Sequence, residues 1–157
     1  MNISLPIHIA ADRETVWDII TDIPRSIFTI SAIEKIEVLE QGNANLLGFK
    51  WRETRTMFGK EATEVMWITD IEKPHFYTTR AESHGAVYTS KFELQENDSG
   101  TLLTMSFQGT SNSVAAKLMN ILMGWMFKKA TINGLKQDLE DIKTAAEKAA
   151  GSKADSR

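Results

Sequence analysis

The last third of the chain carries one long helical pattern, and this pattern limits the fold more than any other feature. From about residue 113 to residue 149, apolar side chains recur at steps of three, four and seven residues, which places them on one face of a helix. A single amphipathic helix of this length needs a large apolar surface to cover. The rest of the chain must supply that surface. The apolar face is formed by Ile121, Trp125, Ile132, Leu135, Leu139 and Ile142.

The preceding residues predict strands interrupted by two short helices. Residues 3–9 alternate between apolar and polar side chains, as a strand does, and Asp12 is a good N-cap for a first short helix. A second short apolar piece follows at residues 27–30. The separators between the later strands are short and turn-like, which favours an antiparallel meander. The six later strand candidates are residues 33–40, 47–57, 61–71, 75–82, 86–95 and 101–109.

This order predicts an α+β fold in which a curved antiparallel sheet of about seven strands wraps around the C-terminal helix. The sheet has one face that must be covered, and the long helix is the only element large enough to cover it. We expect a single domain over residues 1–150. Gly151 looks like a helix cap, and residues 151–157 are expected to form a flexible C-terminal tail.

Composition excludes several classes of function. The 157 residues carry a formal net charge of -3, with no basic cluster, so nucleic acid is not an expected partner. The chain has no cysteine, which rules out disulfides and thiolate chemistry. The N-terminus lacks the pattern of a signal peptide, so we expect a cytoplasmic protein. Lys117 and Asn120 interrupt the most apolar stretch, which is too short to cross a bilayer, so no integral membrane segment is expected.

Four stretches carry a resemblance to a known family. They are IHIAADRETVWDIITDIPRSIFTISAIEKIEVLEQG, LLGFKWRETR, ITDIEKPHFYTTR and TINGLKQDLEDIK. Together they resemble the START/Bet v1-like superfamily (SRPBCC), in particular its polyketide cyclase/dehydrase-like branch, over about residues 1 to 145. The resemblance implies a helix-grip fold with an internal cavity between the sheet and the C-terminal helix.

The apolar start of the long helix would then face the sheet, the cavity and the two short helices at once. Unbranched methionine side chains can repack around ligands of different shapes, which makes three of them candidate cavity liners. Plain core packing and a subunit interface, such as that of a homodimer, are the alternatives. The candidate ligand-binding residues on this helix are Met119, Leu122, Trp125 and Met126, and Met123 shares their surroundings.

The third strand gives the most informative polar pattern. If Trp51 points inward, the period of two sends Glu53 and Arg55 inward as well. On the next strand, Met66 is a natural inward residue, and Glu64 shares its parity. We predict that Glu53, Arg55 and Glu64 form one electrostatic unit that orients a polar part of a ligand. The alternative is a solvated strand end. Tyr88 is also inward, by the parity of Phe92 and Leu94.

The sequence contains no recognisable motif for metal binding, phosphate binding or nucleophilic catalysis. His8, His75 and His84 share neither a helical face nor a metal-ligand spacing, so no metal site is predicted. The chain also shows no phosphate loop and no nucleophile elbow. No cofactor and no catalytic residue are therefore assigned.

Three functions follow from these observations. We expect the protein to bind or carry a hydrophobic small molecule, such as a lipid or an aromatic, polyketide-like compound. A second hypothesis is a cyclase or dehydratase in which Glu53, Arg55, Glu64 and Tyr88 act on a carbonyl-bearing substrate. A third is a protein-interaction module of the toxin or co-chaperone type. The sequence leaves open whether the protein is an enzyme.

Overall fold

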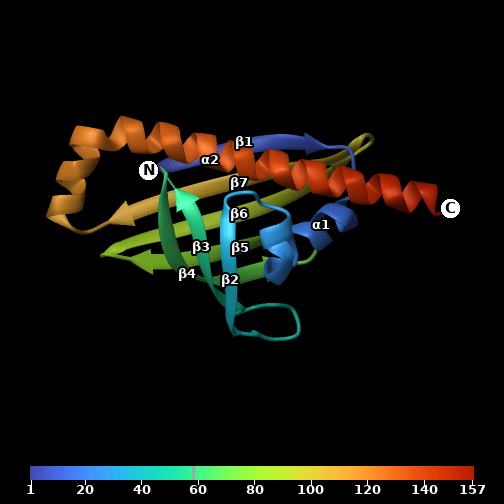
Figure 1. The fold of residues 1–157 in the computed structure, drawn as a ribbon, viewed down its shortest axis with the longest axis horizontal. Coiled ribbons are helices and arrows are strands. Elements are labelled where there is room, and N and C mark those ends of the chain that lie inside the picture. Colours follow the sequence, from blue (N-terminus) through green and yellow to red (C-terminus); the bar gives the residue numbers. More distant parts are fainter. Residues whose placement is uncertain (58) are drawn as a thin grey trace.

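The computed structural model describes residues 1–57 and 59–157, apart from the side chains of Ala116, Met119 and Asn120. Seven strands and three helical segments follow one another (Figure 1). They are β1 (Asn2–Ile9), α1 (Arg13–Thr21), the 3₁₀ helix η1 (Ile23–Phe28), β2 (Ile33–Glu40), β3 (Lys50–Met57), β4 (Lys60–Glu72), β5 (Phe76–Ser83), β6 (Ala86–Asn97), β7 (Gly100–Ser111) and α2 (Val114–Asp155).

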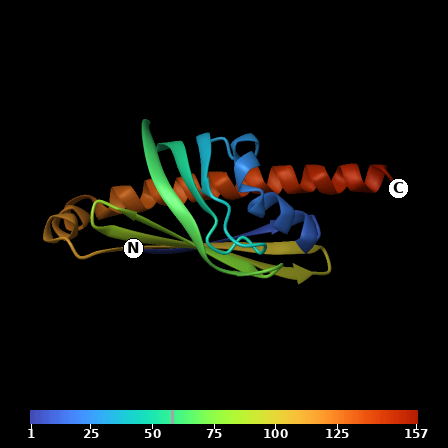
Figure 2. The same cartoon turned by 90° about the horizontal axis from the view of Figure 1, so that it is seen from below.

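The strands form one antiparallel sheet in the order β1-β7-β6-β5-β4-β3-β2. Strands β2 to β7 pair as a meander, and β1 joins the far side of β7. The sheet curls strongly, so that β1 and β7 run nearly along α2 while β2 and β3 run across it (Figure 1 and Figure 2). The predicted helix-grip architecture, with seven strands and two short helices after the first, is confirmed.

Local sequence explains how the elements begin and turn. Asp12 caps α1 by accepting a hydrogen bond from the backbone N–H of Thr15 at 2.7 Å. Gly100 starts β7 with φ +144°, and a Cβ atom there would lie 2.1 Å from the carbonyl oxygen of Ile9. Only glycine therefore allows β7 to begin this close to the end of β1.

The core lies between the concave face of the sheet, α1 and the C-terminal half of α2. Tyr77 stands at its centre, with its ring edge-on to Trp17 at 6.2 Å and its hydroxyl donating to the carbonyl oxygen of Ile20 at 3.0 Å. On the helix side, the buried residues recur at steps of three and four. They are Leu135, Leu139, Ile142 and Ala146.

Polar contacts hold the same half of α2. The backbone N–H and the hydroxyl of Ser31 both donate to Oδ2 of Asp141, at 2.8 and 2.7 Å. Near its end, Lys153 donates to Thr15 Oγ1 at 2.8 Å. The helix continues through Gly151 to Asp155. The predicted cap at Gly151 is wrong, and most of residues 151–157 is helical, because a glycine inside a helix costs only about 1 kcal/mol relative to alanine and does not have to end it.

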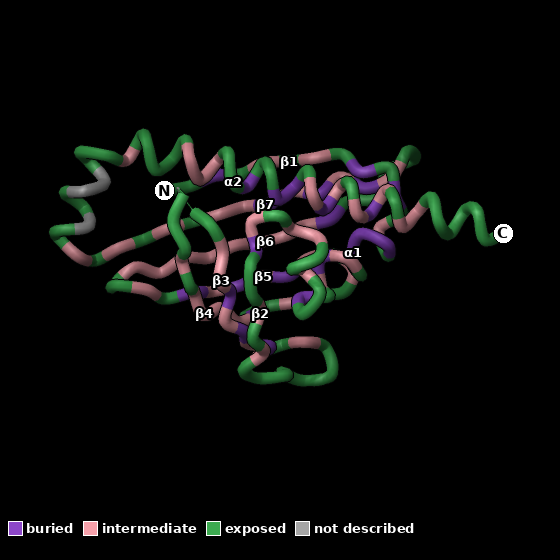
Figure 3. The backbone as a smooth tube through the Cα atoms, in the orientation of Figure 1, coloured by how far each residue is buried: buried purple, intermediate pink, exposed green. Residues whose placement is uncertain are grey.

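The first part of α2 is different. The helix changes direction there and the tube is mostly green, marking exposed residues (Figure 1 and Figure 3). We call residues 114–129 the apolar segment. The expectation that the sheet and the short helices enclose this segment is wrong for its described side chains. Those exposed are Val114, Leu118, Ile121, Leu122, Met123, Trp125, Met126 and Phe127.

Candidate functional site

Strand register brings the predicted inward residues into one row on the concave face. Trp51 lies opposite Met66 and Met66 lies opposite Ala81. Ala81 in turn lies opposite Tyr88, and Tyr88 opposite Gly109. Residues directly opposite each other share a face of the sheet. The row therefore crosses five strands, and it contains three of the residues predicted from sequence.

Burial changes along the concave face. Trp51 and Ala81 are buried, whereas Met66 and Tyr88 are only partly buried. The ring of Tyr88 stacks on that of Phe107, with centroids 5.9 Å apart, and Phe107 is also partly buried. At the other end of the same face, Leu103 is fully buried. We call the end formed by Met66, Tyr88 and Phe107 the open end of the sheet, since its apolar side chains keep part of their surface in solvent.

A buried ion-pair cluster links β3 to α2. Arg55 Nε lies 2.7 Å from Glu53 Oε1, and Arg55 Nη1 lies 3.0 Å from Asp138 Oδ2. The indole N–H of Trp51 donates to the other oxygen of Glu53 at 3.3 Å. The side chains of Glu53 and Asp138 are only 9% and 4% exposed, so both carboxylates depend on Arg55 for compensation.

The cluster has two carboxylates for one cation, and its electrostatics reflect this imbalance. Burial raises the pKa of Asp138, and the attraction of Arg55 offsets that effect only in part. Burial alone would lower the pKa of Arg55, but Glu53 and Asp138 raise it overall. Burial, and then the charge of Glu53, raises the pKa of Tyr77. Among the described residues, Oδ1 of Asp138 is buried without a hydrogen-bond partner.

Glu64 does not join this cluster. It lies directly opposite Glu53 across β3 and β4, but among the described side chains it forms no ion pair with Arg55. Burial raises its pKa, and a hydrogen bond from Ser83 and the charge of His84 partly oppose that rise. The predicted pairing of Glu53 with Arg55 is thus confirmed, and the predicted membership of Glu64 is wrong, because Arg55 turns toward α2.

Asp138 is the residue that sequence reasoning missed. It lies three residues after Leu135 and four before Ile142, and so falls on the apolar face of the helix. A carboxylate in that position was a readable signal, because an acidic side chain on a buried face needs a partner.

The predicted site residues of α2 do not meet those of the sheet. Leu122, Trp125 and Met126 are exposed on the outside of the apolar segment, and the side chain of Met119 lies outside the described residues. A hollow of about 270 Å³ opens beside Trp125 and Met126. Their role in ligand binding stays a prediction.

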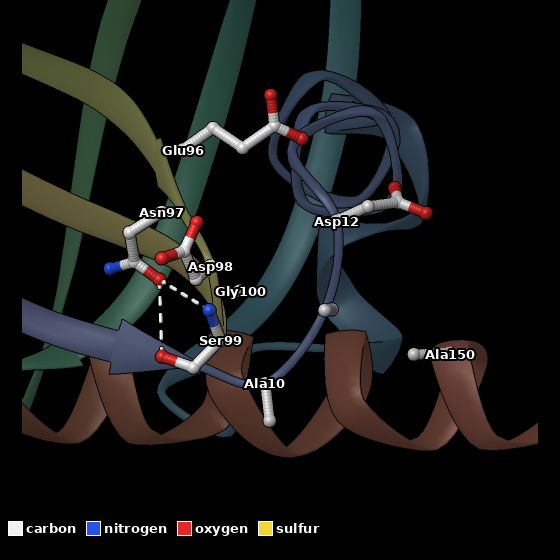
Figure 4. Close-up of a pocket in the computed structure, with 9 residues that line it drawn as sticks. Ala10, Asp12, Glu96, Asn97, Asp98, Ser99, Gly100 and Ala150 are labelled. Atoms are coloured by element: carbon white, nitrogen blue, oxygen red, sulfur yellow. Dashed lines mark hydrogen bonds between the residues drawn. The ribbon is translucent and has the colours of Figure 1, made fainter.

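A second hollow, of about 410 Å³, opens at the far end of the sheet, between the β6–β7 turn and the start of α1 (Figure 4). Its lining is polar: Asn97 Oδ1 accepts from the backbone N–H of Ser99 at 3.1 Å and from its hydroxyl at 3.2 Å. Asp12, in the same wall, is already used as the cap of α1. Neither hollow is the enclosed cavity expected between sheet and helix.

Within the described part of the chain, no three histidine, aspartate or glutamate side chains are grouped so that they could hold a metal ion. No helix in that part is long and apolar enough to span a membrane.

A curved seven-stranded sheet that grips a C-terminal helix defines the class of START-like proteins. Residues 1–147 match the family model described as "Polyketide cyclase / dehydrase and lipid transport". The chain belongs to this family. No curated protein sequence matches it.

Solved structures agree on the fold. The protein TTHA0849 from Thermus thermophilus superposes with a TM-score of 0.80 at 13% identity, over 96% of this chain and 99% of that one. The Zhui aromatase/cyclase from Streptomyces sp. R1128 gives 0.76 at 18% identity, over 94% and 93%. A START superfamily protein from Mycobacterium smegmatis gives 0.72 at 16% identity, over 96% and 97%. At these identities the likeness concerns the fold alone.

Proposed function

We propose that the protein binds a hydrophobic small molecule at the open end of the sheet. One observation carries the proposal: Met66, Tyr88 and Phe107 point to the concave face and stay partly exposed, while the paired Leu94 and Leu103, farther along β6 and β7 on that face, are buried. Covering such side chains with an apolar ligand removes their surface from water and is favourable. The family description, which names lipid transport, supports a ligand of this class.

The ion-pair cluster supplies the polar part of this proposed site. Asp138 Oδ1 is a buried acceptor without a partner, and an unsatisfied buried acceptor costs free energy. A hydroxyl group on a mostly apolar ligand would satisfy it. Pockets for small molecules commonly combine many apolar contacts with a few polar groups that orient the ligand.

A bulky side chain beside the row, at the open end of the sheet, tests this proposal. Ser90 lies opposite Phe107 and Thr79, on the concave face, and its neighbour Thr89 points to the other face. Ser90→Phe should weaken binding of anilinonaphthalene sulfonate, and of members of a panel of fatty acids and polycyclic aromatic compounds, by about tenfold or more.

Thr89→Phe is the matched control and should bind these compounds as the wild type does. Urea melts of both variants would establish that each is folded. Equal binding by the two folded variants, or no binding by the wild type across the whole panel, would count against a ligand site at the open end.

Cyclase-type acid–base chemistry is a second candidate, favoured by the position of Glu64. Its carboxyl is partly exposed at the same end of the sheet, and burial raises its pKa, which suits a proton-transferring group. A solved structure with this fold carries the name aromatase/cyclase. Glu64→Gln should then abolish ring closure of a linear polyketone and leave its binding intact. Turnover that survives the change would exclude this role.

The expected cytoplasmic location and the homodimer stay predictions.

A further inference from the structure

The apolar segment exposes more hydrophobic surface than a soluble helix normally does. Six of its side chains are at least half exposed, and Trp125, the largest of them, is 70% exposed. Isolated apolar residues on a surface are ordinary, but a contiguous set of this size marks an interaction site. The six residues are Val114, Leu118, Ile121, Leu122, Trp125 and Met126.

These side chains form a stripe along one side of the helix. Val114, Leu118, Ile121 and Trp125 are spaced by four, three and four residues, so successive members lie on the same side of adjacent turns, and the stripe follows the change of direction of the helix (Figure 1). Leu122 and Met126 follow the same spacing and widen the stripe. The stripe faces away from the core, since its members are exposed in the folded chain.

Lysines, and no carboxylates, accompany the stripe. Lys117 precedes Ile121 by four residues, Lys128 follows Ile121 by seven, and Lys129 follows Trp125 by four. No aspartate or glutamate occurs between residues 99 and 137, although the chain has 21 acidic residues and a formal net charge of -3. The apolar segment is therefore a local exception to the charge of the whole protein.

We infer that the outer side of the apolar segment docks on a membrane surface rich in anionic lipids. A helix whose exposed apolar side chains are accompanied by lysines can lie in the interface of such a membrane, with the apolar side chains in the acyl boundary. The lysine stems extend along the apolar surface while their ammonium groups meet lipid phosphates. The inference goes beyond ligand binding and does not depend on it.

The charges argue against a second copy of this chain as the occupant. Pairing two copies of the segment would place lysines near lysines, and the segment has no carboxylate to compensate them. A lipid surface supplies the missing negative charge. The hollow of about 270 Å³ also suits lipid, because Trp125 and Met126 form its apolar wall and Lys129 stands at its side.

Flotation with lipid vesicles tests the inference. The full chain should bind vesicles of phosphatidylcholine mixed with phosphatidylserine, and bind vesicles of phosphatidylcholine alone far more weakly. Added salt should weaken binding, because it screens the lysine charges. Brominated acyl chains should quench the fluorescence of Trp125, and Trp125→Phe should lose that part of the quenching.

Matched variants separate the contribution of the apolar side chains to membrane binding from the contribution of the lysine charges. Trp125→Ser should reduce binding strongly, while Phe28→Ser, which removes another highly exposed aromatic ring, should not. Lys128→Gln with Lys129→Gln should reduce binding to the anionic vesicles by roughly fivefold or more per lysine. Lys35→Gln with Lys148→Gln makes the same charge change on other exposed surface and should have little effect.

Two outcomes would overturn the inference. One is equal binding to the neutral and the anionic vesicles, or binding that the segment variants leave unchanged. The other is a concentration-dependent dimer in sedimentation that Trp125→Ser abolishes, which would assign the stripe to a second copy of the chain. All the substituted side chains are exposed, so the folded state should survive each change.

Discussion

The two halves of α2 belong to one continuous helix but meet different surroundings. In the C-terminal half, Leu139 is 2% exposed and packs in the core, and Asp141 and Lys153 anchor the helix to other elements. In the apolar segment, Leu122 is 67% exposed. Leucine is therefore a core residue in one half and a surface residue in the other. Apolar character alone predicts that a helix needs a partner, and the location of charges indicates which kind.

The largest expected effect contrasts the same substitution in the two halves. Leu139→Ala should lower the free energy of unfolding by about 2 to 5 kcal/mol, because it leaves a cavity in the core. Leu122→Ala should change it by less than about 0.5 kcal/mol. Urea melts of both variants measure the difference. Similar losses in the two variants would show that the apolar segment packs against the rest of the chain in solution.

A second contrast concerns charges on the two faces of β3. Arg55→Met leaves Glu53 and Asp138 buried without their cation and should cost about 3 kcal/mol. Arg52→Met is the control: Arg52 pairs with Glu37 at 2.7 Å on the other face, where both side chains are over 40% exposed, and its loss should cost less than about 1 kcal/mol.

The triple variant Glu53→Gln, Arg55→Met, Asp138→Asn should recover much of the loss of Arg55→Met, since it removes the stranded charges as well. Additive losses in the triple variant would mean that the cluster is solvated and that its carboxylates do not depend on Arg55.

A smaller effect should appear in the pH dependence of stability. Burial raises the pKa of Asp138 in the folded state above its ordinary value of 3.8. The folded state therefore holds the proton more tightly than the unfolded state, and the stability this contributes is present at low pH and is lost as the pH rises through the raised pKa. The wild type should thus lose stability relative to Asp138→Asn as the pH rises from about 3.8 toward neutral. Melts of both proteins over this range measure the difference between their free energies of unfolding. A wild type that gains stability relative to Asp138→Asn as the pH rises would contradict a raised pKa for Asp138.

The sequence predicted the fold well because its signals were local. Strand alternation, short turns and the helical spacing of Leu135, Leu139 and Ile142 each depend on neighbouring residues. The inward parity of Trp51, Glu53 and Arg55 followed from the same kind of rule and was confirmed.

The errors arose where distant elements meet. Parity gives the face of a side chain but not its partner, so Glu64 was assigned to Arg55 while Asp138, 83 residues away from it in the chain, was missed. The apolar segment was expected to be enclosed because its composition resembles that of a core helix. Its exposure accompanies the change of direction of α2 in this segment (Figure 1), which no local pattern reports.

The two anchored carboxylates of α2 also restrict sliding of the helix along its own axis. Asp138 is held by Arg55 on β3, and Asp141 by Ser31 just before β2. A shift of one turn, about 5.4 Å, would bring Asp141 to Arg55 or Asp138 to Ser31. In either direction one of the two anchors would then face an uncharged side chain. Apolar packing alone would tolerate several positions of the helix along its axis. Two contacts made by carboxylates three residues apart allow only one position. The translational position of α2 is thereby defined, and with it how far the apolar segment extends beyond the sheet.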